Sequence, residues 1–411
     1  MTFRELLTHA PIRDYLGARV TAASGRGIEL AIMVVFVVQT VGVTREQVGF
    51  ATSAAAVTGL LVGFPAGVIA DRVGARRTLM VLTLAQVLAM SSFVLVFNFP
   101  SYLVAVCIFT ACYSASYPVS QALAGSITTD ATRAPAMAAT RAAVNLGIAV
   151  GSVVALLYLS TGVGWHGRAS LGFAAVLVGL SLVFYLRMPG DARVEPVPLR
   201  ATFAAAKDWR YGILAFLMAP NLMVFQLLTI GVPLWVTFHG NLSNSLVSIC
   251  TLLNTLIIVA LQFPLGARIN TVRRARTSLF LVGFGLAATC VCMGLGLGVH
   301  TVWLAATLVI LAAVLLSFTE IIETSANWEL SYSFAPAATR TTHLALFGMA
   351  SSVADIIGPI ALSSWVMGAG SLGWYLLGAF LAAVALAQVY YVTMFFRRRP
   401  ERLQTVVETI G

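Results

Sequence analysis

Twelve long apolar segments, separated by short polar connections, dominate this sequence. They span residues 15–39, 48–70, 78–97, 101–124, 137–158, 169–186, 212–238, 246–267, 278–299, 302–326, 345–367 and 372–396. Each approaches or exceeds the roughly 20 residues that a helix needs to cross the hydrocarbon core of a bilayer. A helix satisfies its backbone hydrogen bonds internally, as lipid requires of any spanning segment. The pattern predicts an all-α integral membrane protein with twelve transmembrane helices.

The composition agrees with this prediction. The chain has 411 residues, of which 59% are hydrophobic and 10% charged, and its mean hydropathy is +0.92. Soluble domains carry about one-quarter charged residues. Charged residues such as Arg4 and Arg13 precede the first segment without a small-residue cleavage site. The first segment is therefore expected to stay as a membrane anchor and not to be removed as a signal peptide.

The basic residues fall mainly on one side of the expected membrane. Of 25 Lys and Arg residues, 20 lie in connections that share one side, two (Arg45 and Arg168) lie on the other, and three (Arg19, Arg26, Arg141) lie within apolar segments. This positive-inside distribution predicts that both termini lie in the cytoplasm. The membrane is then expected to be the plasma membrane, which is the inner membrane in a cell that has two membranes. The net charge of +10 is therefore explained without nucleic acid as a partner.

One longer connection and two short repeats divide the chain into halves. The connection 188–211 separates six segments within residues 1–187 from six within 212–411. Two short motifs recur in order: Phe64-Pro65-Ala-Gly67 returns as Phe263-Pro264-Leu-Gly266, and Ala131-Thr132-Arg133 returns as Ala338-Thr339-Arg340. Internal repeats of this kind are how many transporters are built. Two pseudo-symmetric six-helix bundles are therefore expected.

A short charged corner joins the second and third segments. Its characteristic residues are Gly67, Asp71, Arg72, Gly74, Arg76 and Arg77. Gly74 is expected to let the chain reverse, while Gly63 and Gly67 are expected to leave a smooth helix face for close packing. Asp71 is the only acid among three arginines and is placed to form an ion pair or to meet a helix N-terminus.

This corner resembles the loop signature Gly-x-x-x-Asp-Arg-x-Gly-x-Arg-Arg of the major facilitator superfamily, which lies between helices two and three. The resemblance implies two six-helix bundles about a central cavity lined by helices one, four, seven and ten. It also implies transport driven by an ion gradient. In that family Asp71 would lock the second helix to the start of the eleventh, near Thr341 and Thr342, in the outward-facing state. Asn270 replaces Asp71 in the second half, so this lock is not expected twice.

Six of the charged residues within the apolar segments stand out as candidates: Arg26, Glu29, Arg141, Glu320, Glu323 and Asp355. Each costs about 2.5–3.5 kcal/mol at the membrane centre, so each needs a partner or a purpose. Arg26 and Glu29 are three residues apart and share one helix face. The pair is either a proton-carrying Glu29 tuned by Arg26 or a structural ion pair.

Glu320 and Glu323 are also three residues apart, in the tenth segment, with no basic residue nearby in the sequence. Two close carboxylates in a low-dielectric setting disfavour double ionisation, as a proton carrier requires. The alternative is that both are solvated by cytoplasmic water. Asp355 precedes Gly358-Pro359 and is expected to line the cavity or to pair with Arg141 or a corner arginine. Arg141 is otherwise expected to reach the cytoplasmic surface.

Uncharged side chains supply candidates for substrate contact, with helix packing as the alternative for each: Asn221, Gln226, Asn254, Tyr113, Tyr117 and Phe225. The five cysteines lie inside apolar segments, and no His pair at ligand spacing, phosphate-binding loop or nucleophile elbow is found. The sequence therefore predicts no enzyme, no metal site and no cofactor.

The chain is most similar to the bacterial drug and small-metabolite exporters of the superfamily, through Arg13-Asp14 before the first helix and Pro336, Thr339 and Arg340 before the eleventh. The proton-antiporter motif Gly-Pro-x-x-Gly-Gly is absent from the fifth segment, which reads Gly147-Ile-Ala-Val-Gly151-Ser152. We predict a monomer that couples protons to efflux of an amphipathic or cationic small molecule. The alternatives are proton-coupled uptake of a nutrient and a non-transporting membrane receptor or scaffold.

Overall fold

A computed structural model describes residues 8–128, 130–160, 164–189, 208–239, 242–266, 268–335 and 340–397, and within these ranges all regular structure is helical. The first half consists of α2 (Ala10–Phe36) with the π-helical turn η1 (Val37–Val41), α3 (Arg45–Val73), α4 (Ala75–Ser92) with the 3₁₀ turn η2 (Phe93–Leu95), α5 (Phe99–Ser126), α6 (Asp130–Ser160) and α7 (Gly164–Arg187).

The second half begins with a broken crossing made of α9 (Trp209–Met218), η3 (Ala219–Leu222), α10 (Met223–Gln226), η4 (Leu227–Gly231) and α11 (Val232–His239). It continues with α12 (Ser245–Gly266), α13 (Val272–Leu297), α14 (Val302–Phe334), α15 (Arg340–Ile360) with η6 (Ala361–Val366), and α16 (Ser371–Arg397). Short 3₁₀ and π turns inside a helix often mark functional sites.

Eleven helical stretches in the described residues are long and apolar enough to cross a membrane. A shorter apolar helix, Ser352–Val366, occupies the place of the predicted eleventh crossing. It belongs to a longer helical stretch, because α15 continues directly into η6. The helices therefore account for twelve crossings, and the chain is a multi-pass membrane protein.

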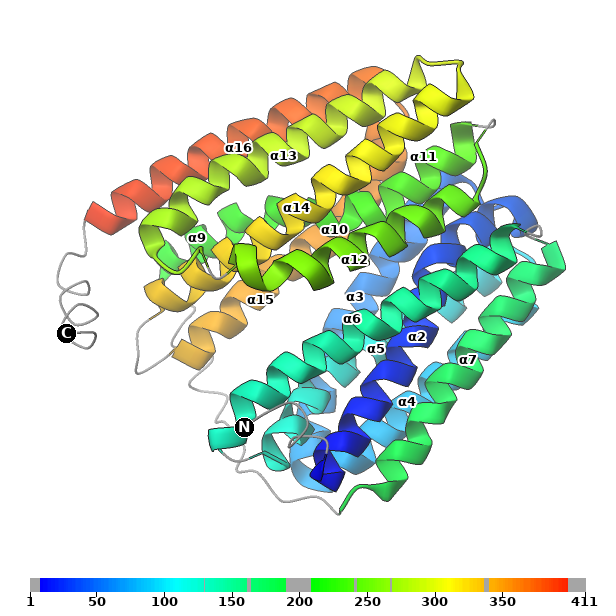
Figure 1. The fold of residues 1–411 in the computed structure, drawn as a ribbon, viewed down its shortest axis with the longest axis vertical. Coiled ribbons are helices and arrows are strands. Elements are labelled where there is room, and N and C mark those ends of the chain that lie inside the picture. The colour runs from blue at the N-terminus through cyan, green and yellow to red at the C-terminus, as the bar shows by residue number, and fades with distance from the viewer. Residues whose placement is uncertain are drawn as a thin grey trace.

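The crossings form two groups, α2–α7 in the blue to green part of the chain and α9–α16 in the green to red part (Figure 1). Across the boundary α12 packs against α6, and α15 packs against α3. Residues 190–207 of the predicted linker 188–211 lie outside the described residues. We call the end where α2 begins and α7 ends the linker end, and the opposite end, where η1 ends and α3 begins, the far end.

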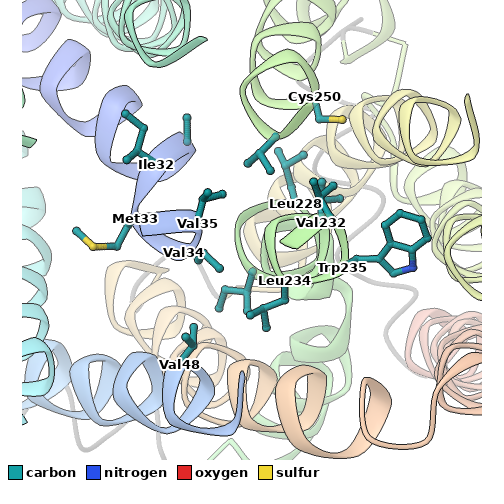
Figure 2. Packing of buried hydrophobic residues seen from close by; sticks show 14 of the residues in the cluster. Ile32, Met33, Val34, Val35, Val48, Leu228, Val232, Leu234, Trp235 and Cys250 are labelled. Atoms are coloured by element: carbon teal, nitrogen blue, oxygen red, sulfur yellow. The ribbon is translucent and has the colours of Figure 1, made fainter. Parts of the chain in front are cut away.

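The halves share a hydrophobic core only toward the far end. There one continuous cluster contains Val34 and Val35 of α2 together with Leu228, Val232 and Leu234 of the seventh crossing. Figure 2 shows Val34 and Val35 on the side of α2 toward the seventh crossing, with Leu234 of that crossing on the side toward α2. Toward the linker end each cluster stays within one half. The first half has clusters around Tyr15 and Leu79 and around Ile12 and Leu16, and the second half has one around Tyr211 and Leu279. Among the described residues, apolar packing therefore holds the halves together only at the far end.

Polar contacts reinforce the closed far end. Gln39 and Asn244 exchange two amide hydrogen bonds, of 2.9 and 2.8 Å. Arg45 Nη1 donates to the carbonyl oxygen of Met367 at 3.0 Å. Gly49 lies so close to the other half that a Cβ there would come within 2.7 Å of the Pro359 carbonyl oxygen. Only glycine permits this approach, which no pattern in the sequence predicted.

The charged corner is a one-residue connection between α3 and α4. Gly74 has φ 108° and ψ 141°, a conformation that side-chain-bearing residues avoid. Arg76 donates to the carbonyl oxygens of Tyr185 and Leu186 at 2.7 and 2.8 Å, and so caps the C-terminal end of α7. The predicted chain reversal at Gly74 is present. Arg72 and Arg77 are exposed, and the side chain of Asp71 lies outside the described residues, as do those of Thr341 and Thr342.

The prediction that Gly63 and Gly67 provide a closely packed helix face is wrong for this conformation. A Cβ added at either glycine would meet no atom of the described residues within 4 Å. The physical reason is that the two halves share no core at the linker end. Among the described residues, nothing therefore packs against α3 at these two glycines.

Candidate functional site

Glu323 of α14 is a buried carboxylate, only 1% exposed. It accepts hydrogen bonds from Asn327 Nδ2, four residues on, and from Thr324 Oγ1 at 3.3 Å. No ion pair to Glu323 is found in the described part of the chain. The residue is therefore held by neutral donors alone and is shielded from solvent.

Glu320, one turn earlier on α14, is half-buried. Asn254 of α12 donates from Nδ2 to Glu320 Oε2 at 2.9 Å and lies 3.2 Å from Ser317 Oγ. Asn254 therefore ties α12 to α14 at the level of the acid pair. The two carboxylates have unequal environments, since Glu323 is enclosed and Glu320 is partly open. The hypothesis that both are simply solvated does not fit the burial of Glu323.

Asp355 of α15 accepts a hydrogen bond from Gln226 Nε2 of α10 at 2.9 Å. Gln226 ends the short α10 and is followed by the π turn η4. Among the described residues no ion pair joins Asp355 to Arg141, which is exposed on α6. Asp355 therefore belongs to a polar contact within the second half.

Arg26 and Glu29 of α2 form a direct ion pair through Arg26 Nη1 and Glu29 Oε2, as their spacing predicts. The Arg26 guanidinium also lies 4.7 Å from the centre of the Tyr113 ring and 5.5 Å from that of Phe109. Such distances are typical of cation–π contacts. Tyr113 in turn stacks on Phe109, with ring centres 6.1 Å apart. The pair thus links the first and fourth crossings.

The remaining candidates separate into two groups. Asn221 is buried and accepts from Gln388 Nε2 of α16 at 2.9 Å, so it joins helices of the second half. Gln226 and Asn254 hold the acids Asp355 and Glu320. Tyr113, Tyr117 and Phe225 are exposed by 43%, 63% and 37%. They can therefore contact a solute or lipid.

Sequence reasoning missed three of these partners. Asn327 follows Glu323 by four residues, a spacing that places both on one helix face and that a search for i, i+4 pairs finds. Ser317 and Gln388 meet their partners from crossings far away in the sequence, so no local signal marks them. No group of three or more metal-ligating side chains is present in the described residues.

The model of the Major Facilitator Superfamily matches residues 16–359 of the chain. The chain belongs to this superfamily. A curated relative in Bacillus subtilis (strain 168), the "Uncharacterized MFS-type transporter YqjV", is 20% identical over 255 residues, which cover 58% of the chain. The match spans 60% of that relative's length.

Solved structures of transporters superpose on nearly the whole of this superfamily member. The nucleoside transporter NupG has a TM-score of 0.73 and 15% identity, with 94% of this chain and 98% of that chain covered. A POT family transporter in complex with 5-aminolevulinic acid has a TM-score of 0.76 and 13% identity, with 93% and 96% covered. Identities this low establish the fold alone.

Membership of the superfamily confirms the resemblance seen at the corner and the predicted fold, twelve helices in two six-helix bundles. It places the chain in a family of transporters whose members are generally not enzymes. It names no substrate, direction or coupling ion.

Proposed function

We propose that this superfamily member is a proton-coupled secondary transporter of an amphipathic small molecule, with Glu320 and Glu323 carrying the proton. The observation that carries the proposal is the acid pair on α14, one member enclosed and the other partly open. A buried carboxylate without a cationic partner is costly, and binding a proton removes that cost. A conformational change that admits water to Glu323 would release the proton again.

The shape of the protein supports alternating access. We take the protein to lie in the plasma (inner) membrane. The positive-inside distribution then favours a cytoplasmic position for the linker end and for both termini. The shared core and the Gln39–Asn244 contact then close the outer side. In the opposite state the cytoplasmic ends would approach, and the exposed glycine face of α3 would gain a partner. Residues 1–187 and 212–411 would move as two bodies joined by 188–211 within a single working monomer.

Export is the first candidate direction, because the residues around Arg13-Asp14 and Thr339-Arg340 resemble those of exporters. Uptake is the second, because the similar folds include a nucleoside transporter and a POT family transporter. Cells that lack an exporter become more sensitive to a toxic solute. Cells that lack an importer lose growth on a nutrient, so paired growth screens of a deletion strain separate the two.

Proton release from purified protein tests the coupling. Candidate solutes are added to detergent-solubilised protein in weak buffer with a pH-sensitive dye. Glu323→Gln and Glu320→Gln should each reduce the release caused by an active solute. Glu329→Gln is the matched control, since Glu329 lies on the same helix and its carboxylate accepts a hydrogen bond from Ser333 at 2.9 Å, away from the acid pair.

Release that persists undiminished in the Glu320→Gln, Glu323→Gln double variant would refute coupling through this pair. A receptor or scaffold predicts that no solute releases protons and that the cellular phenotype survives both substitutions. These outcomes separate the transport proposal from the non-transporting alternative.

A further inference from the structure

A small cavity, lined by apolar side chains and by several polar ones, lies inside the first half, away from the acid pair. It has a volume of about 50 Å³ and lies between α2, α4, α5, α6 and α7. The polar side chains that line it include Arg19, Arg26, Gln86, Tyr113, Ser116 and Tyr185. One water needs about 10–15 Å³ of such space, so the cavity has room for a few waters or for one carboxylate group. It contains two cations and no acid in its lining.

Arg19 is a cation with no carboxylate partner among the described residues. Its interactions are with the side chains of Tyr15, Tyr113 and Tyr185, and its Nε is buried without a hydrogen-bond partner. A guanidinium stays charged in any protein setting, so it cannot escape the cost of burial by losing a proton. Arg19 is therefore a buried positive charge without a counterion among the described residues, and its side chain lines a cavity that an anion can enter.

Glu29 accepts a hydrogen bond from only one of the guanidinium nitrogens of Arg26. Arg26 Nη1 donates to Glu29, and no hydrogen bond from the other guanidinium nitrogens is found in the described part of the structure. A guanidinium has five N–H donors. Arg26 follows Arg19 by seven residues, two helical turns, so both project from one face of α2 into the same cavity.

The cavity is accessible beside exposed aromatic rings. Tyr117 also lines it, and Tyr113 and Tyr117 are 43% and 63% exposed. Backbone contact between α2 and α5 is sparse, and long side chains span the space: Arg26 reaches Tyr113, and Tyr15 bonds Ser120 at 2.7 Å. An apolar body attached to a carboxylate can therefore lie against Tyr113 and Tyr117 while its charged group enters the cavity.

We infer that Arg19 and Arg26 form a binding subsite for the carboxylate group of an organic solute. Binding at this subsite does not depend on the proposed transport function. The inference rests on that function only where it takes the bound solute to be the transported molecule. It narrows the substrate class to amphipathic molecules that carry a carboxylate. A free inorganic anion would use the same arginines but would gain nothing from the aromatic rings.

Ligand-dependent thermal stability of the purified full-length protein tests the subsite. Benzoate is the probe, benzamide is its neutral match, and chloride and phosphate are compared at equal ionic strength. Benzoate should raise the melting temperature in a saturable way, and benzamide should not. Arg19→Gln should weaken benzoate binding about tenfold or more, as expected for a lost charge-assisted hydrogen bond. Arg273→Gln, an exposed arginine of α13, should leave it unchanged.

Ser116→Leu is the second variant, because it fills the cavity while keeping both arginines. It should abolish the benzoate effect even if Arg19→Gln does not fold. Equal stabilisation by benzamide, a full benzoate effect in Ser116→Leu, or phosphate binding as tight as benzoate binding would overturn the inference. Benzoate binding without Glu323-dependent proton release would retain the subsite and refute the coupling proposal. Glu323-dependent proton release without saturable benzoate binding would refute the subsite and leave the coupling proposal standing.

Discussion

At the scale of single residues, the ion pair of Arg26 and Glu29 is buried. Replacing one partner should therefore lower the stability of the protein more than replacing both. Their side chains are 24% and 8% exposed. Arg26→Met leaves Glu29 without its cation and should destabilise the protein by about 3–5 kcal/mol, because an uncompensated buried charge is costly. Adding Glu29→Met to the first substitution should recover most of that loss. Thermal unfolding in detergent measures both effects.

The control for this pair is Glu46→Gln. Glu46 pairs with Arg45 at 2.6 Å but is half exposed, so its loss should cost less than about 1 kcal/mol. If the single and double variants at Arg26 and Glu29 are equally unstable, the two charges are not coupled and the ion-pair interpretation fails. Full transport in the double variant would show that Glu29 carries no proton.

At the scale of an element, the turn between α3 and α4 depends on the backbone of one residue. Gly74→Val should destabilise the protein by about 1–3 kcal/mol, because φ 108° is strained for a residue with a Cβ. Gly63→Ala is the control, since its Cβ would meet nothing within 4 Å and alanine favours helix. Melting temperatures should therefore fall for the first variant and hold or rise for the second. Equal behaviour would contradict the assigned backbone.

Elements with a local pattern were predictable from the sequence, whereas contacts between distant crossings were not. The twelve apolar segments and the reversal at Gly74 follow from residues that are neighbours in the chain. The hydrogen bond from Gln226 to Asp355 joins positions 129 residues apart, and that from Asn254 to Glu320 joins positions 66 apart. Their partners depend on how whole helices pack. For the same reason the free face at Gly67 was missed, because it depends on which end of the protein is closed.

At the scale of the whole molecule, transport should require the far end to open. The amide contact between Gln39 and Asn244 joins the two halves there. Oxidation of a Gln39→Cys, Asn244→Cys variant should form a cross-link that stops transport, and reduction should restore it. Each single variant, treated in the same way, controls for oxidation of the five native cysteines. Transport that continues through a complete cross-link would contradict opening at this end.

A larger side chain at position 49 provides the opposite perturbation, because it should prevent the far end from closing, whereas the cross-link prevents it from opening. A Cβ at Gly49 would overlap Ser363 Oγ and lie 2.7 Å from the Pro359 carbonyl oxygen. Packed interfaces yield little to such overlap, so Gly49→Leu should force α3 away from η6 and shift the protein out of this conformation. A membrane-impermeant maleimide should then label Gln39→Cys faster. Gly63→Leu, whose added side chain begins in open space, should leave the labelling rate unchanged. A rate unaffected by Gly49→Leu would mean that this contact does not hold the far end closed.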